Sequence, residues 1–110
     1  MANVYKNIKV DLTSTDPTTV YTVPSETTAL IRSIRVSNDD TSNACTLTLT
    51  LTNTSSAVFS LEKDKSIAAK TSDEILKAML IATESEVIKA TAQNANDLHI
   101  IISVLEISNS

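Results

Sequence analysis

Cys45 and His99 are the only cysteine and the only histidine in this 110-residue sequence. A cysteine thiolate activated by a neighbouring histidine can act as a nucleophile. Nothing in the spacing of these two residues supports such a pair, and no third orienting group stands out. A small buried apolar side chain is the ordinary role for Cys45, and a neutral ring bonded to a neighbour in a strand is the ordinary role for His99. We therefore expect no catalytic residue.

Acidic residues occur in four short pairs, but none of them matches a known metal-binding pattern. Calcium needs several oxygen ligands that converge from one loop. The loop "SNDDTSN" (37–43) could contribute some of these oxygens, yet side-chain turns already explain its Asn and Asp residues. The four pairs are Asp39–Asp40, Glu62–Asp64, Asp73–Glu74 and Glu84–Glu86. We expect them to be solvated turn residues, and we predict no metal site.

The composition excludes several other functions. The chain contains no glycine, so neither a P-loop nor a dinucleotide-binding fingerprint can occur, and no cofactor is expected. The formal net charge of -4 disfavours nucleic-acid binding. A single cysteine cannot form an intramolecular disulfide. The segment "MANVYKNIKVDL" has neither an apolar signal core nor a membrane span, so we expect synthesis in the cytoplasm and no membrane partner.

The length and the hydrophobic content fit one domain over residues 1–110 with its own core. Hydrophobic residues make up 42% of the chain and aromatic residues only 3%, so Leu, Ile, Val and Ala must build that core. Only Tyr5, Tyr21 and Phe59 could stack on a sugar, and we assign Phe59 to the core.

The stretch "CTLTLTLTN" (Cys45–Asn53) alternates without exception between apolar and hydroxyl side chains. This period of two predicts a strand with one dry face and one wet face. Regular T-x-T spacing could present hydroxyls to ice or to a sugar, but an array would need the same spacing on neighbouring strands. Exposed strand positions favour Thr in any case.

Other strands are predicted from alternation, β-branched residues and turn signals. "LHIIISVLEI" (Leu98–Ile107) is apolar at both odd and even positions over most of its length, which predicts a central strand covered on both faces. "KDK" (Lys63–Lys65) reads as a charged turn. The remaining predicted strands are Val4–Leu12, Thr18–Val23, Ala29–Asn38, Ala57–Glu62 and Ser85–Gln93.

The segment Ser72–Ala82, "SDEILKAMLIA", is ambiguous. Ser72 could cap a helix, and the apolar residues that follow form a helical stripe, so in isolation the segment favours a helix. The whole pattern of about eight short strands with frequent turns nevertheless predicts an all-β fold. We expect a single antiparallel β-sandwich, either jelly-roll or Ig-like.

Two long stretches resemble a family of small virion proteins of tailed bacteriophages. They are "VYTVPSETTALIRSIRVSN" (20–38) and "KATAQNANDLHIIISVLEIS" (89–108), and the resemblance spans residues 19–108. In that family the turn is usually Pro, a small residue and Gly, where this chain has Pro24, Ser25 and Glu26. The resemblance implies an all-β sandwich without catalytic residues. It also makes residues 75–82 a strand, joined to residues 86–92 by a turn at residues 83–85.

The resemblance implies a structural role in a virion. Proteins of this class either decorate the head or belong to the neck, tail or fibre apparatus, and decoration proteins commonly form trimers that clamp neighbouring major capsid proteins. We therefore expect a capsid decoration or cement subunit, homo-oligomeric and trimeric, that binds the major capsid protein or other virion proteins. The alternatives are a neck, tail or fibre component and a soluble ligand-binding β-sandwich.

The N-terminal segment Ala2–Leu12 is the candidate docking arm. A terminal strand readily pairs with the edge of a partner's sheet. The alternative is an ordinary edge strand of the chain's own domain. The residues expected to dock are Val4, Tyr5, Ile8, Val10 and Leu12.

Overall fold

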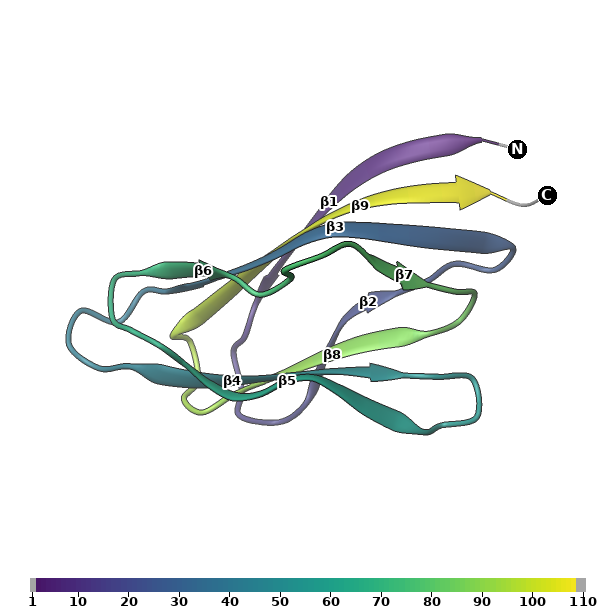
Figure 1. The fold of residues 1–110 in the computed structure, drawn as a ribbon. Coiled ribbons are helices and arrows are strands. Elements are labelled where there is room, and N and C mark those ends of the chain that lie inside the picture. Colours follow the sequence, from purple (N-terminus) through teal and green to yellow (C-terminus); the bar gives the residue numbers. More distant parts are fainter. Residues whose placement is uncertain (1, 109–110) are drawn as a thin grey trace.

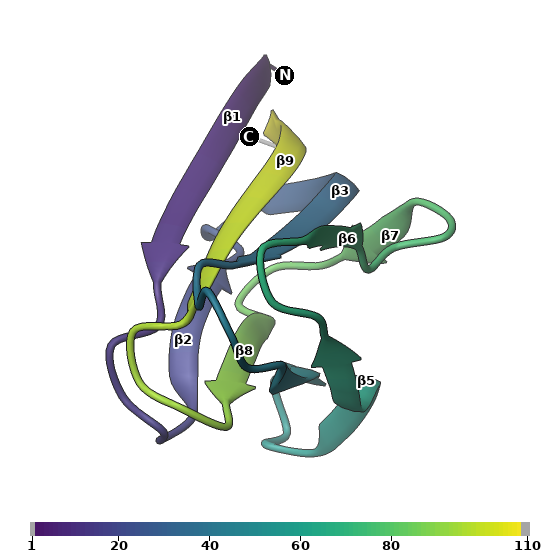
Figure 2. The same cartoon turned by 90° about the vertical axis from the view of Figure 1, so that its left-hand side faces the viewer.

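The computed structural model describes residues 2–108, which form nine β-strands in two antiparallel sheets that face each other (Figure 1). We name these sheets A and B. Sheet A has the order β1 (Asn3–Asp11), β9 (Leu98–Ser108), β3 (Thr27–Asn38) and β6 (Ser72–Glu74), and β7 (Leu80–Ala82) also pairs with β3. Sheet B has the order β2 (Thr18–Thr22), β8 (Val87–Ala92), β4 (Cys45–Thr52) and β5 (Val58–Ile67). Figure 2 shows the two layers from one end, with β1 at one edge of sheet A.

The topology is that of a jelly roll. Because β6 and β7 both pair with β3, they take the place of one interrupted strand, and each sheet then has four strand positions. Successive strands mostly alternate between the two sheets, as they do in the eight-stranded jelly roll. The predicted all-β antiparallel sandwich of about eight strands is confirmed. No helix within residues 2–108 is long and apolar enough to cross a membrane.

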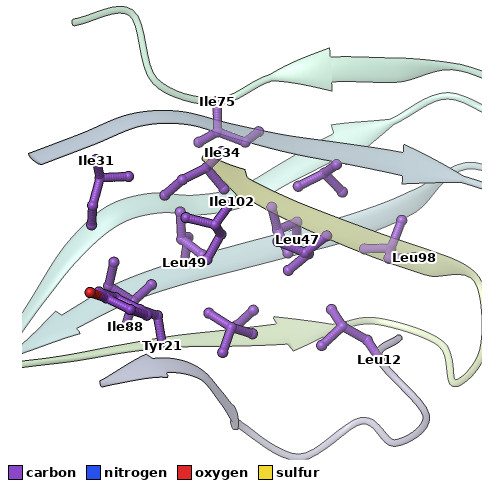
Figure 3. Packing of buried hydrophobic residues seen from close by; sticks show 14 of the residues in the cluster. Leu12, Tyr21, Ile31, Ile34, Leu47, Leu49, Ile75, Ile88, Leu98 and Ile102 are labelled. Atoms are coloured by element: carbon purple, nitrogen blue, oxygen red, sulfur yellow. The ribbon is translucent and has the colours of Figure 1, made fainter. Parts of the chain in front are cut away.

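Aliphatic side chains from both sheets fill the space between the layers (Figure 3). The alternation in β4 works as predicted, because Cys45, Leu47 and Leu49 are fully buried while the threonines between them remain partly accessible. Complete burial of one leucine side chain contributes about 1.5–3 kcal/mol to the free energy of unfolding. The buried aromatic residue is Tyr21. The assignment of Phe59 to the core is wrong, because that side chain lies near the start of edge strand β5 and is 55% exposed.

The region 72–82 is neither a helix nor one continuous strand. β6 and β7 each contain three residues, and residues 75–79 between them lie outside any strand. The Glu74 carboxylate accepts hydrogen bonds from the backbone N–H groups of Ile34 (2.9 Å) and Leu76 (3.2 Å) and from the Ser33 hydroxyl. Pairing with β3 therefore overrides the helical preference, and Ile75 is buried in the core instead of on a helix face.

The predicted charged turn at Lys63–Lys65 is wrong, because β5 runs through it. The strand accommodates these residues with two register shifts against β4. Asp64 has a φ of 50° there. Its backbone N–H donates to Thr48 Oγ1 at 3.1 Å, and Thr48 Oγ1 donates to Asp64 Oδ1 at 3.2 Å. A β-bulge in an edge strand thus replaces the turn.

β9 is a central strand as predicted, but the protein covers only one of its faces. Leu98, Ile100 and Ile102 point into the sandwich and are fully buried. Ile101, on the other face, is 42% exposed. The prediction that both faces are covered is therefore wrong for the chain by itself, since no second layer formed by residues 2–108 lies over the outer face of sheet A.

Among the described residues, six that are not glycine adopt the left-handed backbone region. Glu26, with a φ of 56°, occupies the turn position at which the virion proteins that the sequence resembles usually have Gly. The turn conformation is therefore kept although the glycine is absent. The other five are Ser56, Asp64, Lys70, Ser85 and Asn96. Asn or Asp, the expected substitutes for glycine, occupy only two of the six positions.

Replacing Glu26 with Gly should stabilise the protein. The left-handed conformation costs a residue with a Cβ roughly 1–2 kcal/mol, and glycine avoids this cost. Glycine also has a larger entropy in the unfolded state, which offsets about 0.5–1 kcal/mol of that gain. We expect a net gain of about 0.5–1 kcal/mol in the free energy of unfolding, measured by urea titration. Ser25→Gly is the control, since Ser25 is not in the left-handed region. Equal effects of the two substitutions would contradict this account.

Candidate interaction surfaces

The structure separates the two residues considered for nucleophilic catalysis. Cys45 is fully buried in sheet B, with its Sγ 3.8 Å from the carbonyl oxygen of Thr46. His99 lies on the outer face of sheet A, between two carboxylates. Its Nε2 is 3.4 Å from Asp11 Oδ1, and its Nδ1 is 3.2 Å from Asp39 Oδ2. A thiol inside the sandwich cannot meet an imidazole outside it, so the two do not form a catalytic pair.

The loop considered for calcium uses its polar atoms to fold itself. Asp40 accepts backbone N–H bonds from Ser42 (2.8 Å) and Asn43 (3.1 Å), and these bonds hold the pKa of its carboxyl below the usual value. Asn38 accepts from the Asp40 N–H and donates to two backbone carbonyl oxygens. The predicted side-chain turns are present. Within residues 2–108, no group of three or more His, Cys, Asp or Glu side chains is arranged to hold a metal ion.

The candidate docking arm is β1, which pairs with β9 along its whole length. Leu12, just after the strand, is fully buried, and Ile8 and Val10 pack against the core. Val4 and Tyr5 are 47% and 76% exposed. Three of the five proposed arm residues therefore belong to the chain's own core, while the first two remain available to a partner.

The free edge of β1 is the longest regular sheet edge in the described part of the chain. β1 contains nine residues, and its pairing with β9 has no register shift. The other edge of sheet A is divided between two three-residue strands. In sheet B, β5 has two register shifts and the five-residue β2 has one. Short or bulged edges resist pairing with other chains, so β1 is the edge best suited to accept a partner strand.

A buried carboxylate joins β1 to both sheets. Glu106 of β9 points inward and is only 7% exposed. Lys6 of β1 lies 2.9 Å from its Oε1, and the hydroxyl of Tyr21, in sheet B, donates to its Oε2 at 2.5 Å. A buried charge needs such partners, and Glu106 has one on each side. Lys6, Glu106 and Tyr21, which we call the triad, hold together the end of the sandwich at which β1 begins.

The environment of the triad shifts two pKa values in opposite directions. Burial raises the pKa of Tyr21, and the hydrogen bond to Glu106 raises it further. Burial alone would raise the pKa of Glu106, but the hydrogen bonds from Tyr21 and Lys6 outweigh that effect and lower it. The protein therefore favours neutral Tyr21 and ionised Glu106 at neutral pH.

The outer face of sheet A carries a row of apolar side chains that crosses four strands. The register places Tyr5 opposite Leu105, Leu105 opposite Leu30, and Leu30 opposite Ile81. Tyr5 and Ile81, at the two ends of the row, are 76% and 57% exposed, and the two leucines between them are partly exposed. We call these four residues the apolar row. No element of the described chain covers it.

The outer face of sheet B is mostly polar, although Val58 and Val87 lie on it opposite Thr52. The four threonines of β4 lie there, with Thr48 opposite Thr91 and Thr50 opposite Lys89 and Ser60. Neighbouring strands thus extend the hydroxyl pattern more than the sequence suggested, but a lysine interrupts it. The two outer faces of the sandwich therefore differ in chemistry, one apolar at one end and the other hydroxyl-rich.

Comparison with known proteins shows likeness in fold alone. No protein-family model matches the sequence, and no curated protein matches it. A solved structure of Bacillus endospore appendages, described as disulfide-linked pili, is similar at 12% identity and a TM-score of 0.58, over 98% of this chain and 89% of that one. A chain of the T13 IBDV viral particle is similar at 7% identity and a TM-score of 0.54 over 94% of this chain. This chain covers only 30% of that one. A bacterial pilus protein and a viral capsid protein thus share the fold.

Tyr21→Phe should destabilise the protein in a pH-dependent way. It leaves the buried carboxylate of Glu106 short of one hydrogen bond, which costs about 1–3 kcal/mol at neutral pH. Because the folded-state pKa of Glu106 is lowered, the stability that it contributes is present above the unfolded pKa of about 4.3 and is lost as the pH falls through the folded value. The difference from wild type should therefore shrink in acid, as measured by urea titration at several pH values.

Tyr5→Phe is the matched control, because Tyr5 is the other tyrosine and is 76% exposed. It should leave the free energy of unfolding nearly unchanged at every pH. A difference between Tyr21→Phe and wild type that stays constant from neutral to acid pH would contradict the role given to the ionised carboxylate.

Proposed function

We propose that this protein is a non-enzymatic structural subunit of a virion, a head decoration or cement protein that binds the assembled shell. The observation that carries the proposal is the uncovered apolar row on sheet A, because a soluble sandwich rarely exposes such a surface unless another protein covers it. The viral capsid fold and the resemblance to phage virion proteins support the same role. The separation of Cys45 from His99 removes the one nucleophile–base pair that the sequence offered.

The features of this molecule match what a cement protein requires. A protein that binds only the assembled shell stabilises that state by mass action, and it needs docking surfaces instead of catalytic groups. The major capsid protein is the proposed partner, and association among copies of this chain, as the trimer implied by the resemblance, is part of the proposal. The free edge of β1 would pair with a strand of the partner, with Val4 and Tyr5 at the contact.

The copy number of this chain in purified particles tests the proposal. We expect quantitative mass spectrometry to find a copy number comparable to that of the major capsid protein, or a fixed fraction of it. A copy number far below this would place the chain in the neck, tail or fibre apparatus instead. Absence from particles would contradict a virion role and would favour a soluble ligand-binding module.

Deletion of residues 2–5 tests the docking arm. It removes the exposed Val4 and Tyr5 but keeps Lys6 and the buried Leu12. We expect the shortened protein to fold, as judged by its circular dichroism spectrum and thermal midpoint, and to bind purified shells at least about tenfold more weakly in a co-sedimentation assay. Unchanged affinity would show that β1 is an ordinary edge strand.

A filament subunit is the second candidate, because the pilus structure matches this chain over nearly its whole length. That pilus is described as disulfide-linked, whereas this chain has one cysteine and buries it completely. Any filament of this protein would therefore be held by non-covalent contacts. Electron microscopy of the concentrated protein distinguishes the two candidates, since regular filaments formed without other proteins would favour the second.

A further inference from the structure

We propose that the outer face of sheet A docks on the shell through a carboxylate side chain of the shell protein, which Arg32 binds in a hollow beside the apolar row. The inference rests on the proposed function, because it names the chemistry of the partner that would cover this face. Three features support it: the hollow itself, the hydrogen-bond donors that line it, and the distribution of charge over the outer face of sheet A.

The hollow lies at an irregularity in β3. Between Ile31 and Ser33, β3 advances two residues while β9 advances one, so Arg32 is the additional residue of a β-bulge. Such bulges redirect side chains and occur next to functional sites. An open hollow of about 330 Å³ is lined by Tyr5, Lys6, Asn7, Arg32, Ser103 and Val104. Because Tyr5 also belongs to the apolar row, the hollow and the row form one continuous surface.

The polar groups of the hollow are available as hydrogen-bond donors. Within residues 2–108, the Arg32 side chain takes part in no hydrogen bond or ion pair. Lys9 Nζ donates to Asn7 Oδ1 at 2.7 Å, which leaves the amide N–H groups of Asn7 free to donate. The Ser103 hydroxyl also has no partner in the described chain. A carboxylate only accepts hydrogen bonds, and a guanidinium can bind it through two parallel N–H···O bonds. Three donors around one opening therefore suit a carboxylate.

The charge around the hollow favours an acidic partner. The outward positions of β1, β9 and β3, which the structure describes in full, carry three cationic residues in the rows near the hollow: Lys9, Arg32 and Arg35. The one acidic residue at these outward positions is Asp11, which lies at the far end beside His99. The face is therefore positive around the hollow, although the net charge of the chain is -4.

A protein surface fits these features better than a polyanion or a second copy of the chain. A nucleic acid binds through many cations, and three cations on a chain of net charge -4 are few. A phosphate backbone would also leave the apolar row uncovered. A second copy docked by the same face would place two unpaired Arg32 side chains in one interface. A shell protein with an acidic side chain among apolar ones would pair the guanidinium and cover the row. Tyr and Arg, which meet in this hollow, are enriched among the residues that dominate binding energy.

Co-sedimentation of variants with purified shells tests the inference. Arg32→Gln removes the charge, and we expect it to weaken binding at least about tenfold. Arg32 is exposed and unpaired in the free chain, so the variant should keep the wild-type thermal midpoint. Arg32→Lys keeps the charge but not the two parallel bonds, and it should recover part of the affinity. Added salt should weaken the binding of wild type more than that of Arg32→Gln, because the variant has lost a charge pair.

Arg35→Gln is the matched control. Arg35 is an exposed arginine on the same strand and the same face, but it lies outside the hollow and its strand partner is Glu74. It should weaken binding less than Arg32→Gln does.

Two results would overturn the inference alone: equal weakening by the two glutamine variants, and unchanged binding of Arg32→Gln. The proposed function would stand in both cases, because the wild-type chain would still bind shells. Oligomers of the free chain that Arg32→Gln disrupts would show that a second copy covers this face, and would also overturn the inference. Shells that do not bind the wild-type chain would overturn the inference and the proposed function together.

Discussion

The central strand β9 constrains the whole molecule because it is apolar on both faces and lies in the middle of sheet A. A jelly roll formed by a single chain buries only the inner face, where Leu98, Ile100 and Ile102 meet the side chains of sheet B. The outer face keeps Ile101 and the apolar row in contact with water. Exposed apolar surface of this kind favours association, since covering it releases the same free energy that drives the core together. The structural role proposed for the protein follows from this imbalance.

The polar interactions determine which surfaces remain available. The triad of Lys6, Glu106 and Tyr21 ties β1 to β9 and to sheet B, so β1 is held in its own domain while its outer edge stays free. Glu74 interrupts the opposite edge of the sheet by bonding to the backbone around Ile34. One edge of sheet A is therefore long and regular and the other is broken. A subunit with one regular edge and one apolar face can contact two kinds of neighbour.

Much of this fold could be predicted from the sequence, because alternation reports directly which strand positions face the core. The strand Cys45–Asn53 and the central position of Leu98–Ile107 were predictable in this way. Alternation does not report register or bulges, so β5 was divided at Lys63–Lys65, and Phe59 was assigned to the core although it lies in an edge strand. In residues 72–82, pairing with β3 outweighs a local helical pattern.

The apolar row was not predictable, because its members come from four strands whose pairing only the structure gives. The one available signal was the double-sided apolar pattern of β9, which indicated that something must cover the second face.

The most direct test of this account is the reactivity of Tyr5 toward tyrosine nitration in the free chain and in the chain bound to purified shells. The chain has two tyrosines, and Tyr21 is buried inside the sandwich, so it serves as the internal reference. If the outer face of sheet A is covered in the assembly, Tyr5 should be nitrated readily in the free chain, where it is 76% exposed, and should become protected on the shell. A rate of Tyr5 nitration that is the same in both, while sedimentation shows that the chain is bound, would mean that this face stays open and would contradict the account.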